Sequence, residues 1–403
     1  MRAKFVNLWY NVISLILGII YGRDRNVILF GSWMGNRFSD NSRYLFQYLH
    51  FNKRELGLKD VIWATRDIHI YNILRKEGYH TCLIGTSDSK LLHLKAGTQI
   101  LCNMAFERPD FQTDIDTKYS FGAKKIQLWH GVGMKSVGFS SNEYKQISSH
   151  KNVIKKILHS SFFDIFNSLG AWGNATVLAT SEMNATIMCK VLGCSKKKIV
   201  ITGYPRNCEC LRLSKREQNV IDSMKSYRGV ILYLPTFRSS HSSYKSPITD
   251  TKMINFIEGN NILWLEKPHL ADLNFLKPNG TSKNVHTLES DFDTNVLYSF
   301  ATIVISDYSS VVFDAIYRKI PVIMYTPDLD EFKESNVGFL FDIRDVCKGL
   351  LAFSVSDSIN MARQVINDTY FNDIRCETYR NIFNVFWGNS KPSYSEIWEK
   401  LHD

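Results

Sequence analysis

Histidine, arginine, lysine and serine side chains occur where several expected strands end, and these residue types suit the transfer of phosphate groups. The stretch Leu128-Trp129-His130-Gly131 ends one apolar run, and a second glycine follows at Gly133. A histidine at the carboxyl end of a strand can accept a proton near neutral pH. The neighbouring glycines let a ligand approach the backbone closely. The alternative interpretation is a histidine with a purely structural role.

A second candidate stretch, Ser306-Asp307-Tyr308-Ser309-Ser310, lies between an apolar run and an expected helix at Val311–Arg318. Backbone N–H groups at such a helix start, together with the hydroxyls of Ser309 and Ser310, can bind phosphate. The same residues also suit ordinary helix capping. The local sequence leaves both interpretations open.

Two further strand ends carry cations, in Pro235-Thr236-Phe237-Arg238 and in Lys267-Pro268-His269. A pyrophosphate donor needs such counter-charges, because the leaving nucleotide accumulates negative charge as its bond breaks. Isolated cations in loops are usually solvated. Here, however, strand ends of one chain carry His, Arg, Lys with His, and Asp with Ser-Ser, which favours one shared site.

Short apolar runs alternate with helical patterns on both sides of the polar stretch Asn207–Arg228. This alternation predicts parallel sheets with helices on both faces. We therefore expect an α/β chain with two doubly wound, Rossmann-like domains that face each other across a cleft. The expected strands are Asn26–Gly31, Val61–Thr65, Thr98–Asn103, Lys125–Trp129, Thr176–Thr180 and Lys198–Thr202, then Gly229–Leu234, Asn261–Glu266, Ala301–Ser306 and Ile320–Tyr325.

The domain boundaries follow from this pattern and from the length of 403 residues, which is too long for one ordinary core. We expect a membrane-associating helix at 1–25 and an acceptor-side domain at 26–206. A donor-binding domain is expected at 207–385. The last segment, 386–403, is expected to form a helix that packs back on the first domain.

The chain carries 49 Lys and Arg against 39 Asp and Glu, a net charge of +10. This balance favours an anionic partner, which can be nucleic acid, an anionic membrane or a phosphorylated substrate. No helix-turn-helix, zinc-finger or RNA-binding signature is present, so nucleic acid is disfavoured. The eight cysteines lack the paired spacing of a zinc site or a disulfide framework. They indicate reduced thiols in a cytoplasmic protein.

The first 25 residues contain an apolar run from Phe5 to Tyr21 with basic residues on both sides. As a helix the run reaches about 25 Å, short of the roughly 30 Å hydrocarbon core of a bilayer. Asn7, Asn11, Ser14 and Gly18 recur on one helical stripe. We expect an amphipathic helix in the membrane interface at the cytoplasmic face. A single membrane span and a helix packed on the globule are the alternatives.

A second candidate membrane contact is the stretch Tyr144–Asp164, which contains lysines and no acidic residue before Asp164. Its apolar positions, which include Ile154, Leu158 and Phe162, follow a helical period. Two interpretations remain open. The segment is either a core-facing helix with a solvated basic face or a contact with the membrane or with a lipid-linked acceptor.

Taken together, the ordered motifs resemble the CDP-glycerol glycerophosphotransferase family, which includes teichoic-acid primases and polymerases and related capsule polymerases. The resemblance covers roughly residues 26 to 345 in consistent order. The matching stretches are Ser39-Asp40-Asn41-Ser42-Arg43-Tyr44, Leu128-Trp129-His130-Gly131, Thr180-Ser181-Glu182, Thr202-Gly203-Tyr204-Pro205-Arg206-Asn207, Leu232-Tyr233-Leu234-Pro235-Thr236-Phe237-Arg238, Lys267-Pro268-His269, Ser306-Asp307-Tyr308-Ser309-Ser310 and Pro321-Val322-Ile323-Met324-Tyr325.

This resemblance implies a GT-B type fold with the donor held by the second domain. It implies catalytic roles for three residues, with His130 as the general base on the acceptor hydroxyl. Protein cations and a helix start would supply the positive field, so neither a metal nor another cofactor is expected. The implied set comprises His130, His269 and Asp307 as catalytic residues, Arg238, Lys267, His269, Ser309, Ser310 and Asp307 at the donor, and Gly131, Gly133 and Arg206 near the acceptor.

The expected reaction is transfer of glycerol-phosphate or ribitol-phosphate from a CDP-polyol to a lipid-linked or polymeric acceptor, with release of CMP. Two alternatives remain. One is a GT-B glycosyltransferase that uses a nucleotide-sugar, and the other is a non-catalytic, membrane-associated scaffold. The sequence leaves open which polyol is used, whether the enzyme adds one unit or many, and whether the product is teichoic acid or capsule.

Overall fold

The computed structural model describes residues 2–103, 112–136, 174–236, 245–267, 282–333, 338–388 and 391–402, without the side chains of 2–8, 10 and 11. Two candidate site residues, Arg238 and His269, lie outside the described residues. The basic stretch Tyr144–Asp164 also lies outside them.

Contacts along the chain divide it into two compact units. Unit 1 comprises Met1–His130, Gln146–Arg212 and Ser390–Asp403, and unit 2 comprises Gly131–Lys145 and Leu213–Asn389. The sequence predicted that the first domain ends at residue 206. By contacts, unit 1 instead continues to Arg212, and the segment Gly131–Lys145 groups with unit 2. Arg212 stays with unit 1 because its carbonyl accepts hydrogen bonds from Arg43 and Gln47. The segment after His130 groups with unit 2 because Lys135 pairs with Phe339.

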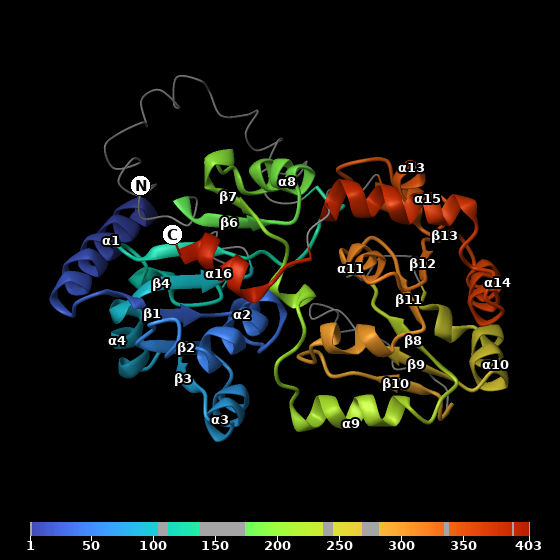
Figure 1. Ribbon diagram of the computed structural model, residues 1–403, viewed down its shortest axis with the longest axis horizontal. Helices are drawn as coiled ribbons and strands as arrows, with labels where there is room; N and C mark the ends of the chain where they lie inside the picture. Colours follow the sequence, from blue (N-terminus) through green and yellow to red (C-terminus); the bar gives the residue numbers. More distant parts are fainter. Residues whose placement is uncertain are drawn as a thin grey trace. The chain divides into compact units, whose positions relative to one another are not determined.

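Unit 1 contains a seven-stranded sheet among the described residues, in the order β3-β2-β1-β4-β5-β6-β7, and every pairing is parallel (Figure 1). The chain order reverses between β1 and β4, the point at which open α/β sheets bind ligands. The strands are β1 (Asp24–Phe30), β2 (Asp60–Thr65), β3 (His80–Leu83), β4 (Ala96–Leu101), β5 (Lys124–Gln127), β6 (Thr176–Ala179) and β7 (Ile199–Ile201).

Polar side chains cap the amino ends of three described helices of unit 1. Asp67 and Ser181, for example, accept hydrogen bonds from the first-turn N–H groups of α3 and α8. The helices are α1 (Arg2–Ile20), α2 (Asp40–Phe51), α3 (Ile68–Lys76), α4 (Ser87–Lys95), α8 (Glu182–Leu192) and α16 (Tyr394–His402), with short 3₁₀ turns η1 (Trp33–Gly35), η2 (Thr117–Tyr119), η5 (Lys196–Lys198) and η6 (Pro205–Asn207).

An aromatic cluster fixes α2 on the sheet of unit 1. The rings of Phe30, Phe46 and Trp63 are almost fully buried. Phe46 meets Phe30 and Trp63 edge to face, with ring centroids 5.6 and 5.2 Å apart. Such contacts add to the burial of apolar area. They hold the amino end of α2, where Asp40 lies, in a fixed position against the strand ends.

Unit 2 contains a six-stranded parallel sheet among its described residues, in the order β10-β9-β8-β11-β12-β13. Its chain order reverses between β8 and β11. The expected architecture of two parallel α/β sheets is confirmed. The strands are β8 (Gly229–Tyr233), β9 (Ile262–Glu266), β10 (Val285–Thr287), β11 (Ile303–Ser306), β12 (Val322–Tyr325) and β13 (Leu351–Ala352).

The helices of unit 2 cover both faces of this sheet (Figure 1). Trp387 packs under α11, and its indole N–H donates to the carbonyl of Phe313 at 3.1 Å. The helical elements are α9 (Lys215–Met224), α10 (Thr251–Gly259), α11 (Val311–Tyr317), α12 (Leu329–Lys333), α13 (Ile343–Val346), α14 (Val355–Ile366) and α15 (Asp373–Ile382), with 3₁₀ turns η7 (Pro247–Thr249) and η8 (Thr294–Phe300) and a π-helical turn η9 (Phe383–Trp387).

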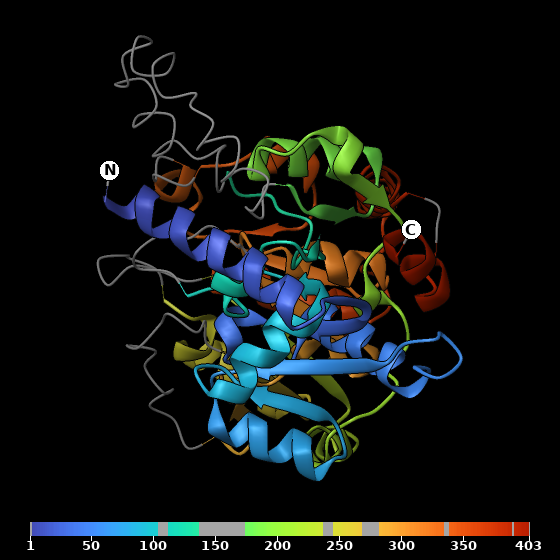
Figure 2. The ribbon, with the colours of Figure 1, turned by 90° about the vertical axis from the view of Figure 1, so that its left-hand side faces the viewer.

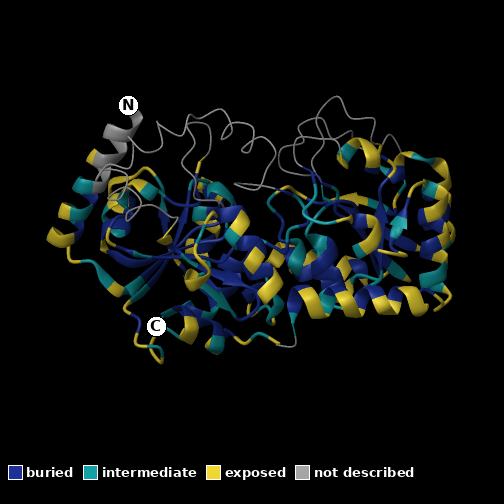
Figure 3. Cartoon of the chain, turned by 90° about the horizontal axis from the view of Figure 1, so that it is seen from above, coloured by how far each residue is buried: buried dark blue, intermediate teal, exposed yellow. Residues whose placement is uncertain are grey.

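The first helix, α1, runs along the outside of unit 1 (Figure 2). The described part of its polar stripe faces the protein, since Ser14 has no exposed area and Gly18 is buried. In the part of α1 whose burial is described, exposed residues lie on the side of the helix that faces away from the protein (Figure 3). Within the described chain, no helix is both long and apolar enough to cross a bilayer.

Candidate active site

His130 lies just beyond the carboxyl end of β5 in unit 1, as expected for a reactive group in an open sheet. Its Nδ1 is 3.1 Å from the backbone carbonyl oxygen of Cys102, which follows β4. Because a carbonyl oxygen only accepts, Nδ1 carries the proton in this contact. In the neutral ring Nε2 is then the nitrogen with the lone pair, which is the form a general base requires.

Two tryptophans pack on the imidazole ring of His130. Trp129 stacks on it with ring centroids 4.3 Å apart, and the centroid of Trp33 is 5.5 Å away. Trp129 has a positive φ of 59° and Gly131 one of 148°. Non-glycine residues seldom adopt a positive φ, and such strain is typical of functional sites. The backbone thus turns sharply on both sides of the histidine.

A buried ion pair between Arg206 and Asp40 contacts the backbone of this turn. Arg206 follows β7, and its Nη1 lies 2.6 Å from Oδ1 of Asp40 and 2.8 Å from the carbonyl oxygen of His130. Both Arg206 and Asp40 are almost fully buried. The side-chain amide of Asn41 donates to the carbonyl oxygen of Trp129 at 2.8 Å. Arg206, Asp40 and Asn41 therefore position His130, and Arg206 acts through the backbone.

Asp114 ties together the loops that surround His130. Its carboxylate accepts three backbone N–H groups, from Met34 at 2.8 Å, Cys102 at 3.0 Å and Asn103 at 2.8 Å. Burial raises the pKa of Asp114 to about 6, although these hydrogen bonds act in the opposite direction. The residue lay outside the sequence motifs. No local pattern marks it, because its partners come from two separate loops, after β1 and after β4.

In unit 2, the described candidate donor residues lie at the carboxyl ends of β8, β9 and β11. Asp307, which follows β11, is wholly buried, and its carboxylate accepts the N–H of Thr236 at 2.9 Å and that of Tyr308 at 2.6 Å. The hydroxyl of Ser306 donates to the carbonyl of Leu234 at 2.6 Å. Asp307 therefore fixes the loops after β8 and β11 against each other.

Ser309 and Ser310 lie directly after this buried turn and are half-buried. Ser310 occupies the N-cap position of α11 but makes no side-chain capping hydrogen bond. The capping interpretation of its hydroxyl therefore gains no support. Tyr308 anchors the turn, with its hydroxyl 2.9 Å from Oδ1 of Asp328.

Lys267 lies beside the same edge of the sheet, after β9. Its backbone N–H donates to the carbonyl of Tyr233 at 3.1 Å, and its Nζ donates to the carbonyl of Phe292. Unit 2 thus gathers Thr236, Lys267, Asp307 and the two serines at the carboxyl ends of β8, β9 and β11. Arg238 follows β8 in the sequence and His269 follows β9, and both lie outside the described residues.

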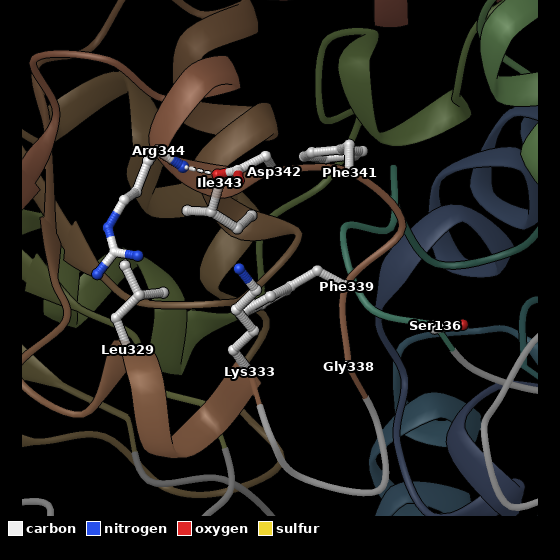
Figure 4. A pocket seen from close by; sticks show the side chains of 9 residues that line it. All are labelled: Ser136, Leu329, Lys333, Gly338, Phe339, Phe341, Asp342, Ile343 and Arg344. Carbon is white, nitrogen blue, oxygen red and sulfur yellow. Dashed lines mark hydrogen bonds between the residues drawn. The ribbon is translucent and has the colours of Figure 1, made fainter.

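The segment that follows His130 forms part of a pocket in unit 2 (Figure 4). The N–H of Ser136 donates to the carbonyl of Gly338 at 3.2 Å, and the N–H of Leu340 donates to that of Met134 at 2.9 Å. The cavity measures about 340 Å³ and has Ser136, Phe339, Lys333 from α12 and Arg344 from α13 on its walls. The chain after His130 is thus anchored in unit 2 by backbone pairing.

Comparison with known proteins places these features in a family context. A model described as CDP-glycerol:poly(glycerophosphate) glycerophosphotransferase matches residues 15–391. A teichoic acid poly(glycerol phosphate) polymerase of Bacillus spizizenii is 23% identical over 87% of the chain and 86% of the relative. A teichoic acid glycerol-phosphate transferase of Staphylococcus aureus is 24% identical over 85% of the chain and 84% of the relative.

Solved structures agree with the fold. The wall teichoic acid polymerase TagF superposes with a TM-score of 0.68 at 16% identity, covering 100% of the chain and 98% of that structure. A variant of that polymerase soaked with CDPG gives a TM-score of 0.66 at 15% identity, covering 100% and 97%. A UDP-GlcNAc 2-epimerase from Neisseria meningitidis bound to UDP-GlcNAc gives 0.50 at 13% identity, covering 93% and 99%. These likenesses show a GT-B-like fold.

Proposed function

The chain belongs to the CDP-glycerol:poly(glycerophosphate) glycerophosphotransferase family, and we propose that it transfers glycerol-phosphate or ribitol-phosphate from a CDP-polyol to a lipid-linked or polymeric acceptor. It is an enzyme of the teichoic-acid polyol-phosphate transferase type. The observation that carries the proposal is the contact between Nδ1 of His130 and the carbonyl of Cys102, which presents Nε2 as a proton acceptor. The pathway is that of teichoic acid or a related capsule.

In the proposed reaction, Nε2 of His130 takes the proton of an acceptor hydroxyl. The hydroxyl oxygen then attacks the β-phosphorus of the CDP-polyol, and a new phosphodiester bond forms. The bond between the β-phosphorus and the bridging oxygen breaks, and CMP leaves with that electron pair. No oxidant or reductant is required.

The donor is proposed to bind unit 2 at the reversal point between β8 and β11. Ligands of open α/β sheets bind outside the carboxyl ends of strands at such a point. Lys267, Ser309 and Ser310 are the described residues proposed to contact the pyrophosphate, because they offer a cation and hydroxyl donors there. Arg238 and His269 are proposed to complete this set, and Asp307 holds in place the loop after β8, which leads to Arg238.

On the acceptor side, Gly131 and Gly133 are proposed to let the acceptor chain approach His130. The enzyme is proposed to work at the cytoplasmic face of the membrane, where a lipid-linked acceptor is available. The exposed apolar residues of α1 support this location.

The decisive experiment measures nucleotide release from CDP-glycerol, CDP-ribitol and a UDP-sugar by the full-length chain. CMP release with a CDP-polyol, and a phosphodiester product by mass spectrometry, are expected. Release of UDP with formation of a glycosidic bond would instead identify a glycosyltransferase. The mass of the product also counts the units added, which separates a primase from a polymerase.

The role of His130 is tested with His130→Asn. The asparagine amide can still donate to the carbonyl of Cys102 but provides no base at the position of Nε2. CMP release should fall by about 100-fold or more, while donor binding, which is proposed for unit 2, should be retained. Unchanged turnover would show that another group takes the proton. His269→Ala is also expected to lose turnover, because His269 is proposed to contact the pyrophosphate of the donor.

A further inference from the structure

A basic pocket lies at the amino ends of the strands of unit 1, whereas His130 lies beyond the carboxyl ends. Its cavity measures about 620 Å³, within the size range of small-molecule sites. The lining residues belong to β1, β4, β5, β6 and β7, which are neighbours in the sheet, or lie just before them. Among the described lining residues none is acidic and five are cations, namely Arg23, Arg25, Lys124, Lys125 and Lys198.

Lys125 is the most buried of these cations, and it has no counter-ion among the described residues. Only 7% of it is exposed, and its Nζ donates to a single neutral acceptor, the carbonyl of Ala123, at 3.4 Å. Burial, and then the neighbouring Arg23, lower the pKa of Lys125 to about 8, so the ammonium group still carries its charge at pH 7. Buried charges are normally paired, and this lysine therefore calls for an anion.

Arg23 adds a second charge, which only neutral groups contact in the described chain. Its Nη1 donates to the carbonyls of His93 at 3.0 Å and Ala96 at 2.8 Å, where α4 ends. Its Nε is buried and reaches no hydrogen-bond acceptor among the residues that the structure describes. The carboxylate of the next residue, Asp24, pairs with Lys59 instead. The positive charge beside the pocket is therefore not neutralised by a neighbouring carboxylate.

The rest of the wall supplies groups that suit a phosphate ester. Arg25 and Lys198 are exposed, and neither forms an ion pair with a described residue. Asn174 and Thr176 offer neutral hydrogen-bond donors, and Phe121 gives one apolar side chain. Arginine and lysine are the usual partners of phosphate oxygens. The cavity is larger than a phosphate group alone and has room for the organic part of an ester.

We propose that this pocket binds the phosphoryl group of a small, soluble phosphate monoester through Lys125, Arg25 and Lys198. A monoester carries roughly −1.5 to −2 charges near pH 7, whereas a diester carries a single one. Several clustered cations without counter-ions therefore favour the monoester. The site lies at the opposite ends of the strands from His130. It goes beyond the proposed function and does not depend on it.

The rim of the pocket is tested by calorimetric titration of the full-length chain with glycerol 3-phosphate. Arg25→Gln with Lys198→Gln should raise the dissociation constant at least tenfold, which is about 1.4 kcal/mol. The matched control is Lys76→Gln with Lys348→Gln, which removes the same charge at exposed positions elsewhere and should change binding less than threefold. Equal affinity of the rim variant and the unmodified chain would overturn the proposal.

The charge state of the ligand is tested with glycerophosphoglycerol, a phosphodiester with the chemistry of a lipid headgroup or of a polyol-phosphate polymer. Its single charge should make binding at least tenfold weaker than that of glycerol 3-phosphate. Equal or tighter binding of the diester would contradict the proposal, because the pocket would then be a site for a phosphodiester.

The buried cation is tested by thermal unfolding of Lys125→Met. Without phosphate this variant should be more stable than the unmodified chain, because an apolar side chain of similar length replaces an unpaired buried charge. Millimolar inorganic phosphate, compared with sodium chloride of equal ionic strength, should stabilise the unmodified chain but not the variant. Equal stabilisation of both proteins by phosphate would rule out Lys125 as part of the site.

CMP release from CDP-glycerol separates this pocket from the proposed transfer site. The rim variant should release CMP at the rate of the unmodified chain, since neither of its residues belongs to the transfer site. Weak binding of glycerol 3-phosphate with normal CMP release is the expected combination. Loss of both would show that the pocket is part of the transfer site, against the proposal of a separate one.

Discussion

Arg206 contacts two parts of unit 1 that are far from it in the sequence. Its Nη1 bonds Asp40 and also the backbone carbonyl of His130, the proposed base. A motif can mark this arginine, but its partner cannot be read from the motif. The bond to the carbonyl of His130 exists only because β7 lies in the same sheet as β5. Asp114 escaped the sequence motifs for a related reason, since its partners come from the loops after β1 and β4.

Arg206 is predicted to affect turnover more than donor binding. Arg206→Lys retains the charge beside Asp40 but replaces the rigid guanidinium, whose Nη1 bonds both Asp40 and the carbonyl of His130, with a more flexible ammonium group. We expect kcat to fall by at least tenfold with little change in KM for the CDP-polyol. Arg206→Met should in addition destabilise the fold by about 3–5 kcal/mol, since it leaves Asp40 buried without its partner.

Steady-state kinetics and urea unfolding check both statements. The control is Arg54→Lys at an exposed position, which should alter neither quantity. An Arg206→Lys variant with normal kcat would mean that the position of His130 does not depend on the arginine.

His93 is predicted to make the stability of unit 1 sensitive to acid. The ring is fully buried, with Nδ1 2.6 Å from the carbonyl of Ser89 and Nε2 accepting the N–H of Asp116 at 3.1 Å. Burial lowers the pKa of His93 to about 4, from 6.5. A lowered pKa of a base means that the unfolded chain binds the proton first. The stabilising contribution is therefore complete above pH 6.5 and is lost as the pH falls towards 4.

His93→Gln should remove this dependence. Between pH 7 and pH 5 we expect the unmodified chain to lose roughly 2 kcal/mol more unfolding free energy than the variant. Asp114 acts in the opposite direction, because its raised pKa adds stability as the pH falls through about 6. Both proteins contain Asp114, so its contribution cancels in the comparison. His69→Gln, at an exposed site, should match the unmodified chain at each pH.

At the scale of elements, strands with continuous apolar runs were predictable, but three strands at the sheet edges were not. The ten expected strands occur with ends shifted by a few residues at most. β3, β10 and β13 were missed. β3 and β10 lie at the sheet edges and contain polar residues, while β13 spans only Leu351–Ala352. Such strands form because a neighbouring strand offers its backbone groups, which the local sequence does not reveal.

The turn between β5 and the segment at Met134 is predicted to depend on Gly131. Its φ of 148° is strained for a residue with a Cβ atom. Gly131→Ala should cost about 1–3 kcal/mol and lower CMP release, because the strain displaces His130. Gly133 provides a matched control, since an added Cβ there would meet nothing within 4 Å.

Thermal unfolding of Gly131→Ala and Gly133→Ala, together with CMP release by Gly131→Ala and by the unmodified chain, provides the measurement. Gly133→Ala should retain stability within about 0.5 kcal/mol. Equal effects of the two substitutions would argue that backbone conformation at Gly131 has no special role.

At the scale of the whole molecule, two series of strands predicted two sheets because each series repeats the alternation of a doubly wound fold. The course of the chain between the units was less predictable. Gly131–Lys145 belongs to unit 2, although it lies between strands of unit 1. Its grouping depends on backbone pairing of Lys135 with Phe339, a contact between distant residues that leaves no pattern in either segment.

The two cores are predicted to unfold in separate transitions, and α16 belongs to the transition of unit 1. Trp398, Ile397 and Leu401 of α16 are buried, and Tyr394 stacks on Tyr48 with centroids 5.0 Å apart. Trp398→Ala should destabilise unit 1 by about 3–5 kcal/mol and shift one calorimetric transition only.

CDP-glycerol should raise the other transition, since a ligand that binds unit 2 stabilises that unit. Trp9→Ala, at an exposed position, should shift neither transition. A single transition that moves as a whole with both Trp398→Ala and CDP-glycerol would show instead that the units unfold together.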